Sequence, residues 1–282
     1  MRMITGLTVC NSCVDFHPRD EIGGERIGHT YSESVPSAIS TVNLCADYGD
    51  THALCDVSIE VPEASSLAII GPNGSGKSTL LGVLAGTIDA VSGTSTVSGK
   101  PPALVLQSTD VDRSLPITVR DTVSLARYPS LGLFGRFRSD DKAAVETALE
   151  RLDVADLADR QLHELSGGQR QRVLVAQGVA QETDVLLLDE PITGLDMTSR
   201  SIILDLIDEE MANGRTVVMT THNLEEARRC SYVLILNSSA IAFGTPDEAM
   251  IADNLRRAFG GKFIQVGDEF ILDDPHHHHH HH

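Results

Sequence analysis

The amino-acid sequence predicts an α/β fold in which a mostly parallel β-sheet is covered by helices. Three observations favour this fold class. Short apolar runs with the length of buried strands alternate with longer segments of helical periodicity. A glycine-rich loop joins one such run, Leu67–Ile70, to an apolar helix. A second run, Val185–Leu188, ends directly in two acidic residues, as is typical of strands whose carboxyl ends face a ligand crevice.

The composition is that of an ordinary globular protein with a core, since 41% of the 282 residues are apolar and 22% are charged. Acidic residues number 40 against 22 basic ones, and the formal net charge is −18. A surface of this charge repels a phosphate backbone. We therefore expect no general binding of nucleic acid.

The sequence contains no apolar run near the roughly 18 residues that a membrane-spanning helix needs. It does not begin with a basic stretch followed by an apolar one, so we expect no export signal. We expect any link to a membrane to come through a partner. An odd number of cysteines without framework spacing is typical of a reducing compartment. They are Cys10, Cys13, Cys45, Cys55 and Cys230.

The N-terminal part divides into an extension and a strand-rich segment. Residues 1–40 show no sustained period and are predicted to be an extension, unassigned or partly disordered. The next residues alternate between apolar and polar side chains over Thr41–Ala46 and Asp56–Val61, with a turn at Gly49. This pattern predicts an N-terminal antiparallel β region ahead of the buried strand Leu67–Ile70.

The middle of the chain contains a clear amphipathic helix. Ser139 is predicted to be its N-cap, and two aspartates in the first turn suit the positive end of the helix dipole. Apolar residues at helical spacing share one face. The aspartates are Asp140 and Asp141, and the apolar residues are Val145, Ala148, Leu149 and Leu152.

Strands and helices continue to alternate through the C-terminal half, and no internal repeat is visible, so the chain carries one such unit. Thr245 and Glu248 give the last helix a capping box, with Pro246 at its first position. The predicted elements before it are helices over Gly167–Gln181 and Ile202–Met211, the second ending at Asn213-Gly214, strands over Val185–Leu188 and Thr216–Thr220, a short helix from Leu224 and a hairpin over Tyr232–Phe243.

A phosphate-binding loop is the strongest single motif. It fits the pattern G-x-x-x-x-G-K-[ST] and lies between a predicted strand and a helix over Lys77–Ala85, as the motif requires. Glycines let backbone amides point toward phosphates, and the helix N-terminus adds positive charge. Lys77 would reach the β- and γ-phosphates, and the Ser78 hydroxyl would bind Mg²⁺. The loop is Gly71, Pro72, Asn73, Gly74, Ser75, Gly76, Lys77 and Ser78, and Thr79 is counted with it as nucleotide-binding.

Two acids follow the buried strand Val185–Leu188. Asp189 and Glu190 would be delivered to the crevice where open α/β sheets bind ligands. Asp189 suits a metal-linked water, and Glu190 suits orientation or deprotonation of an attacking water. The phosphate-binding loop makes this interpretation stronger than that of an ordinary solvated strand end.

Leu165-Ser166-Gly167-Gly168-Gln169-Arg170-Gln171-Arg172 resembles the signature sequence of the ABC ATPases and lies between the two elements above. Ser166 can cap a helix whose first turn holds two small glycines and leaves amides bare for a γ-phosphate. Four further positions match the family in order. Gln107 resembles the glutamine of the family that senses Mg²⁺ and the attacking water, and Gly194-Leu195-Asp196 resembles the loop that passes between the two subunits. His222 resembles the switch histidine, and Tyr48 resembles the aromatic residue on which adenine stacks.

The resemblance implies a P-loop NTPase core over residues 41–260, with a helical subdomain inserted at about 108–165. It implies ATP as the nucleotide, with Mg²⁺ held through Ser78, Gln107 and Asp189. The catalytic residues would be Lys77, Gln107, Glu190 and His222.

The resemblance also implies an assembly. Ser166, Gly167, Gly168, Gln169 and Asp196 would serve the nucleotide of a second copy of the chain, so that two ATP molecules hold a head-to-tail homodimer together. An integral membrane permease would be the direct partner, with an extracytoplasmic substrate-binding protein as an indirect one. The subunit would then be peripheral, on the cytoplasmic face of the membrane.

The sequence resembles two groups of importers that carry different cargoes. Leu115–Asp121 and Arg127–Phe134 resemble both the zinc and manganese importers and the ferric-siderophore, haem and cobalamin importers. Val175–Gln181 and Ile192–Asp196 look nearer to the zinc and manganese group. We therefore expect import of zinc or manganese, with a siderophore-type cargo as the alternative.

Other interpretations stay open. A soluble ABC ATPase of iron–sulfur cluster assembly is an alternative of another class, whereas an inert scaffold is rejected because the catalytic positions are intact. The tail, residues 261–282, ends in seven histidines that are either an affinity tag or a native metal-binding segment. A structural zinc in the N-terminal extension is the weaker interpretation of Cys10, Cys13, His17 and His29.

Overall fold

The computed structural model describes residues 36–49, 51–107, 116–131, 136–260, 263–266 and 269–272. The predictions for the first 35 residues, including the possible zinc ligands, and for the terminal histidines lie outside these ranges. Residues 37 onward form one compact unit. Among the described residues, none of the helices is long and apolar enough to cross a membrane.

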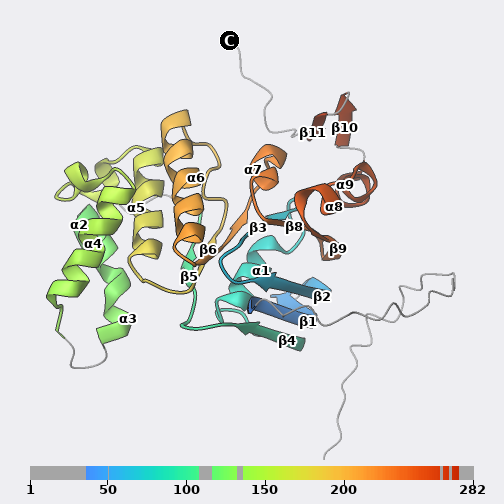
Figure 1. The fold of residues 1–282 in the computed structure, drawn as a ribbon, viewed down its shortest axis with the longest axis horizontal. Coiled ribbons are helices and arrows are strands. Elements are labelled where there is room, and N and C mark those ends of the chain that lie inside the picture. The colour runs from blue at the N-terminus through green and yellow to red at the C-terminus, as the bar shows by residue number, and fades with distance from the viewer. Residues whose placement is uncertain are drawn as a thin grey trace, which may run out of the picture. The chain divides into compact units, whose positions relative to one another are not determined.

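A six-stranded sheet forms the centre of this unit, in the order β5-β6-β7-β3-β8-β9 (Figure 1). Its strands run parallel except for β9, which pairs antiparallel with β8. The predicted α/β fold with a mostly parallel sheet is confirmed. The strands are β3 Ser66–Ile70, β5 Ala103–Val105, β6 Val185–Leu188, β7 Thr216–Thr220, β8 Tyr232–Asn237 and β9 Ser239–Gly244.

A second sheet, in the order β2-β1-β4, is antiparallel. It consists of β1 Ser37–Tyr48, β2 Thr51–Pro62 and β4 Ser92–Val97. The antiparallel β region is therefore confirmed, but both predicted strands are longer, and β4 was not predicted. Its sequence, SGTSTV, has few apolar residues, and none of its side chains is fully buried. A strand of this kind leaves little periodic signal in the sequence.

Alternation along the central strands creates two apolar cores, because successive side chains of a strand point to opposite faces. Leu67 and Ile69 of β3 pack with Leu80 and Leu81 of α1, Lys77–Leu84, beneath the antiparallel sheet. Ala68 and Ile70 belong to the other core, which the helices of the opposite face cover. The phosphate-binding loop thus leaves a strand that is buried on both faces.

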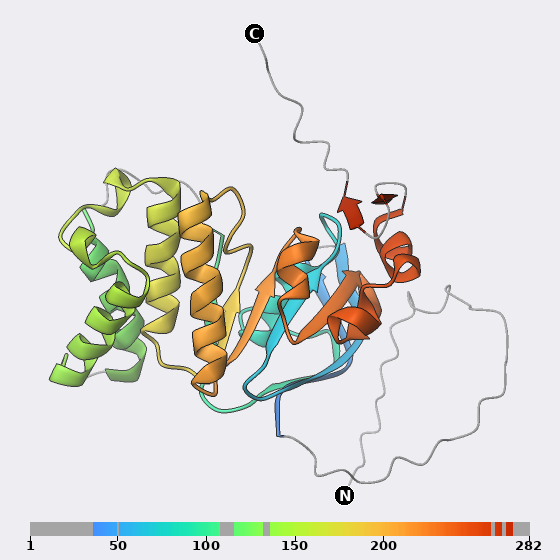
Figure 2. The same ribbon diagram turned by 45° about the horizontal axis from the view of Figure 1, so that its top comes forward.

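Helices α2 to α4 gather on the far side of α5 and α6 from the antiparallel sheet in both views (Figures 1 and 2). They are α2 Val119–Ser124, η2 Leu125–Arg127, α3 Tyr128–Leu131 and α4 Ser139–Arg151, followed by η3 Ala155–Leu157, η4 Leu162–Glu164, α5 Gly167–Val179 and α6 Met197–Ala212. The remaining elements are α7 Leu224–Arg228, α8 Pro246–Ala249, α9 Ala252–Phe259, β10 Phe263–Val266 and β11 Glu269–Leu272.

Two helix starts differ from the prediction. Ser139 is the first residue of α4 rather than its N-cap; Arg138 takes that position, and its backbone amide donates to the Asp141 carboxylate at 2.9 Å. Helix α6 begins at Met197, five residues before the predicted start, because the Asp196 side chain caps it by accepting from the Ser199 amide at 2.9 Å. In both cases an aspartate satisfies a backbone donor of the first turn.

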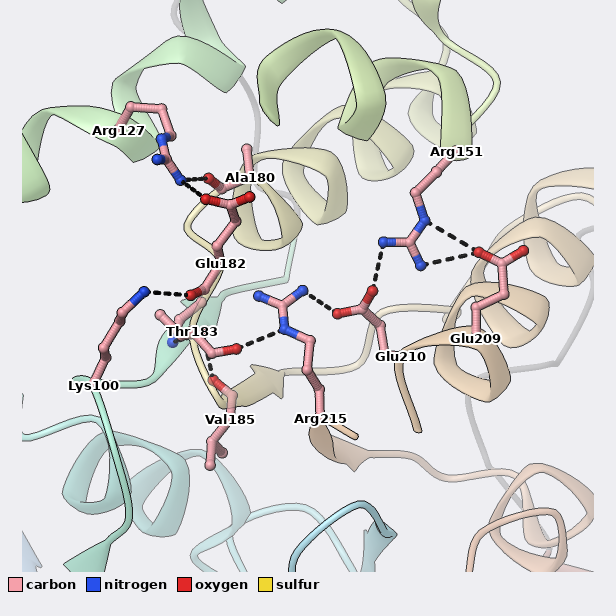
Figure 3. A network of polar contacts seen from close by, with 11 residues as sticks. Lys100, Arg127, Arg151, Ala180, Glu182, Thr183, Val185, Glu209, Glu210 and Arg215 are labelled. Atoms are coloured by element: carbon pink, nitrogen blue, oxygen red, sulfur yellow. Dashed lines mark hydrogen bonds and ion pairs between the residues drawn. The ribbon is translucent and has the colours of Figure 1, made fainter. Parts of the chain in front are cut away.

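A network of buried ion pairs ties α4 to the end of α6 and the start of β7 (Figure 3). Glu210 is fully buried; one of its oxygens lies 2.6 Å from Arg151 Nη1, and the other pairs with Arg215. Arg215 Nε also donates to the Thr183 carbonyl at 2.6 Å. The helices beyond α5 are therefore anchored to the sheet by charge as well as by apolar packing.

Candidate functional site

The loop between β3 and α1 requires glycine at two positions. A Cβ at Gly71 would lie 2.0 Å from the Leu236 carbonyl oxygen of the neighbouring strand β8. Gly76 has a φ of +96°, and a Cβ there would lie 2.6 Å from the Ala53 carbonyl oxygen. Close packing against two other strands thus fixes the loop where the amides of α1 begin.

Lys77 lies inside this loop. Its ammonium donates to the carbonyls of Gly71 at 2.9 Å and Pro72 at 3.1 Å. Burial lowers the pKa of Lys77, while the negative charges of Glu190 and Asp189 oppose that shift. The ammonium thus lies close to two carboxylates and is held by backbone oxygens that an anionic ligand could replace.

Other groups of the loop suit phosphate oxygens. The Ser75 hydroxyl is buried and has no hydrogen-bond partner among the described residues. Ser78 is exposed at the start of α1, and Thr79 is buried behind it. An unsatisfied buried hydroxyl, a cation and the N-terminus of a helix together fit a phosphate-bearing nucleotide.

Asp189 and Glu190 follow β6 at the same edge of the sheet. The Asp189 amide donates to Val105 of β5 at 2.8 Å, and its carboxylate accepts from the Thr220 hydroxyl at 2.6 Å. Glu190 has a φ of +47°, and its amide donates to the same hydroxyl at 2.8 Å. A left-handed backbone is uncommon for a residue with a side chain, and here it turns the chain sharply after the strand.

Three side chains meet the Glu190 carboxylate. His222 Nε2 lies 2.5 Å from one oxygen, and Gln107 Nε2 and Thr193 Oγ1 donate to the other at 3.5 and 3.3 Å. The hydrogen bond with His222 is the main cause that lowers the pKa of Glu190, and partial burial opposes it. Glu190 is therefore held as a carboxylate, the form that can accept a proton from water.

The predicted signature residues lie on another part of the chain, at the start of α5. Ser166 caps that helix by accepting from the Gln169 amide at 3.2 Å, as predicted. Gly168 packs so closely on the α6 start that a Cβ would lie 2.7 Å from an Asp196 carboxylate oxygen, whereas a Cβ at Gly167 would meet nothing within 4 Å.

Asp196 belongs to the same group, and its hydrogen bonds from the Ser199 amide and hydroxyl lower its pKa. Tyr48 ends β1 with 71% of its surface exposed. The structure thus assembles Lys77, Gln107, Asp189, Glu190 and His222 into one cluster and gathers Ser166, Gly168 and Asp196 into another.

The family profile of the ABC transporters matches residues 54–193, a range that includes the loop, the signature sequence and both acids. The manganese transport ATP-binding protein MntB of Bacillus subtilis is 33% identical over 239 residues, which cover 82% of this chain and 96% of MntB. The chain belongs to the ABC transporter family. It is an ATP-hydrolysing subunit, as its relatives and its loop and acids indicate.

Further relatives of this ABC ATPase have names that refer to metals or metal chelates. The zinc transport ATP-binding protein TroB of Treponema pallidum is 36% identical over 80% of this chain and 88% of its own. The iron(3+)-hydroxamate import protein FhuC of Bacillus subtilis is 36% identical over 84% and 91%. A solved metal-chelate type ABC transporter in an inward-facing conformation superposes with a TM-score of 0.73, at 30% identity, over 84% of this chain and 96% of the solved one.

The sequence did not single out two residues of the cluster around Glu190 in this ABC ATPase. Thr193 donates to Glu190, and Thr220 contacts both acids. A threonine near the end of a strand is ordinary in sequence, because threonine favours strands anyway. The order of the parallel strands could have revealed Thr220, because this residue ends β7, which pairs with the strand that leads into Asp189.

Proposed function

We propose that this ABC ATPase energises the import of a metal ion, manganese or zinc, through a separate membrane permease. The similarity to MntB and TroB over four fifths of the chain carries the proposal. The permease would bring an extracytoplasmic substrate-binding protein as an indirect partner. The subunit would be peripheral, on the cytoplasmic face of the membrane.

We assign ATP binding to the β3–α1 loop and to Tyr48. Lys77 would exchange its carbonyl partners for the β- and γ-phosphates, and the buried Ser75 hydroxyl would gain the partner it lacks. The exposed ring of Tyr48 would stack on adenine. These groups supply charge and orientation, which account for most of the catalysis in phosphoryl transfer.

Mg²⁺ would be held by Ser78, Asp189 and Gln107, and its charge would neutralise the phosphate oxygens. The hard oxygen donors of these side chains suit this ion. Glu190 would accept the proton of the attacking water, because its carboxylate is kept ionised. His222 holds that carboxylate from one side and would orient it toward the γ-phosphate.

The second cluster, Ser166, Gly167, Gly168, Gln169 and Asp196, would act on the nucleotide of another copy of the chain. Gly167 supports this role, because its position leaves open space where a Cβ would lie. Amides at the start of α5 could then donate to a γ-phosphate across a dimer interface. ATP binding would close the dimer, and hydrolysis would release it.

A ferric-siderophore cargo is the second candidate, favoured by the similarity to FhuC. Purification of the chain with the permease that accompanies it, followed by reconstitution in vesicles, would separate the two. We expect ATP-dependent uptake of radiolabelled manganese or zinc, and none with Lys77→Ala. Uptake of ferric hydroxamate alone would favour the second candidate, and uptake of none of the three would contradict both.

A further inference from the structure

Thr220 lies where the two proposed catalytic acids meet. It ends β7 and is fully buried, in register with Ile69 of β3 on one side. On the other side, β7 pairs with β6, so that Met219 is in register with Leu188 and Thr220 follows level with Asp189.

The hydrogen bonds of the Thr220 hydroxyl have a defined direction. A backbone amide can only donate, so the hydroxyl oxygen accepts from Glu190 at 2.8 Å. The single hydroxyl proton is then donated to Asp189 Oδ1 at 2.6 Å. One side chain therefore holds the carboxylate of the first acid and the backbone of the second.

We propose that Thr220 is a positioning residue for ATP hydrolysis, which fixes Asp189 and Glu190 relative to each other. The inference rests on the roles proposed above for these two acids. The Thr220 hydroxyl donates to Asp189 Oδ1, which leaves Oδ2 for the Mg²⁺-linked water. It also fastens the amide of Glu190 in the left-handed conformation that presents the carboxylate to His222.

The chain offers a matched control on the same strand. Thr216 is buried to the same degree and points to the same face of β7, since it lies four residues away. Among the described residues, its hydroxyl makes one long contact, 3.5 Å, to the Pro62 carbonyl, at the end of the sheet away from the acids. Thr216→Val thus removes a buried hydroxyl without touching the site.

The test compares Thr220→Val, Thr220→Ser and Thr216→Val in the complete protein. We expect Thr220→Val to lower kcat about 10- to 100-fold, as loss of an outer partner of a metal-binding carboxylate does. KM for ATP should change by less than about threefold, because the phosphate-binding loop is intact. Thr220→Ser keeps the hydroxyl and should restore most of kcat, and Thr216→Val should behave as wild type.

A second readout does not depend on turnover. The Mg²⁺ concentration that half-saturates binding of a fluorescent ATP analogue should rise for Thr220→Val and stay unchanged for Thr216→Val. Should the melting temperature show that Thr220→Val is not folded, Thr220→Ala replaces it, because it removes the hydroxyl without adding a methyl group.

Three results would overturn the proposal: a wild-type kcat for Thr220→Val, an equal loss in Thr220→Ser, or an equal loss in Thr216→Val. Glu190→Gln in the same assay separates this inference from the roles on which it rests. If Glu190→Gln hydrolyses ATP normally, those roles fail. If it is inactive while Thr220→Val is normal, only the positioning role of Thr220 is lost.

Discussion

At the scale of single residues, the contacts of Glu190 support the proposed role of its carboxylate as a base. Its carboxylate receives contacts from residues that are 83, 32 and 3 positions away in the sequence, namely Gln107, His222 and Thr193. The contact with His222 is the shortest, and it lowers the pKa of Glu190 against the effect of burial. Three separate parts of the chain therefore hold this one carboxylate in place.

The pH profile of hydrolysis should report the lowered pKa of Glu190. A lowered pKa keeps Glu190 ionised at pH values where an ordinary glutamate gains a proton, so activity is lost only when the pH falls through that lowered value. His222→Ala removes the main cause, and burial then raises the pKa. We expect the acid limb of kcat/KM to move to higher pH in His222→Ala, and by less in Thr193→Ala.

An unchanged acid limb in His222→Ala would show that the histidine does not set the ionisation of Glu190. If the residual rate of this variant is too low to measure, carbon NMR of the Glu190 carboxyl gives the same pKa directly. The pKa of Glu190 measured in this way should also be higher in His222→Ala than in the wild type.

Lys77→Ala tests the positive charge that lies near Asp189 and Glu190. Its ammonium is buried near two carboxylates, so its loss leaves the loop without the cation that would meet the phosphates. We expect hydrolysis to fall by at least about 100-fold, as loss of a major transition-state charge does. Fluorescent ATP-analogue binding and steady-state turnover would measure this, and normal turnover would contradict the assigned role.

The cluster around Lys77 and Glu190 could be predicted from the sequence where it depends on the topology of the sheet. Parallel strands carry their last residues to one edge, so the loop from Gly71 and the acids Asp189 and Glu190 were expected at the same edge of the sheet. Gln107 and His222 were assigned to the site only by the resemblance to the ABC ATPases. Thr220 was not predicted, because a hydroxyl acquires its role only from the neighbour that the sheet supplies. Nothing in the sequence distinguishes it from Thr216 on the same strand.

Elements with strong periodicity were predicted, and short polar ones were not. The buried strands β3 and β6 and the hairpin β8–β9 lie where the apolar runs placed them. Strand β4 escaped prediction because it has few apolar residues and no fully buried side chain. Helix α2 escaped it because the partners that bury its side chains lie far away in the sequence. The start of α6 was missed because Asp196 matched a loop motif, although its side chain also caps a helix.

The contact between α4 and α6 gives a prediction about stability. Glu210→Ala would leave Arg151 and Arg215 without their shared buried carboxylate, and we expect it to cost about 3–5 kcal/mol of unfolding free energy. Glu209→Ala removes a carboxylate from the same arginine, but that side chain is 58% exposed, so its loss should cost under about 1 kcal/mol. Denaturant unfolding of both variants would measure the difference.

Equal effects of the two substitutions would show that the buried pair adds nothing beyond a surface contact. In Figure 3 the Glu210 carboxylate lies between the two guanidinium groups, while Glu209 approaches Arg151 from the outer side. The two variants therefore differ in burial far more than in chemistry. A larger loss of unfolding free energy in Glu210→Ala than in Glu209→Ala would show that the buried contacts of Glu210 with Arg151 and Arg215 anchor α4.

At the scale of the whole molecule, each copy of the chain would carry two half-sites in the dimer proposed above. One half-site would hold the charged groups around Lys77 and Glu190, and the other would be the start of α5, which Ser166 caps. Within one copy, the Ser166 hydroxyl accepts from the Gln169 amide, and Gly168 packs against Asp196 and Ser199. A second copy, turned head to tail, would bring the two halves together around one nucleotide.

Gly167 and Gly168 allow this assembly to be tested apart from folding. Because Glu190→Gln keeps the shape of the site and removes the base, we expect this variant to form a dimer with ATP and Mg²⁺ in size-exclusion chromatography. Adding Gly167→Val should return this variant to a monomer, because the new side chain would collide with the γ-phosphate in the dimer. Its melting temperature should stay unchanged, because the side chain enters open space in a single copy. Gly168→Val would instead collide with Asp196 of its own chain and lower the melting temperature. A Glu190→Gln protein that stays monomeric, or a dimer that tolerates Gly167→Val, would show that the signature residues do not complete the site of a second copy.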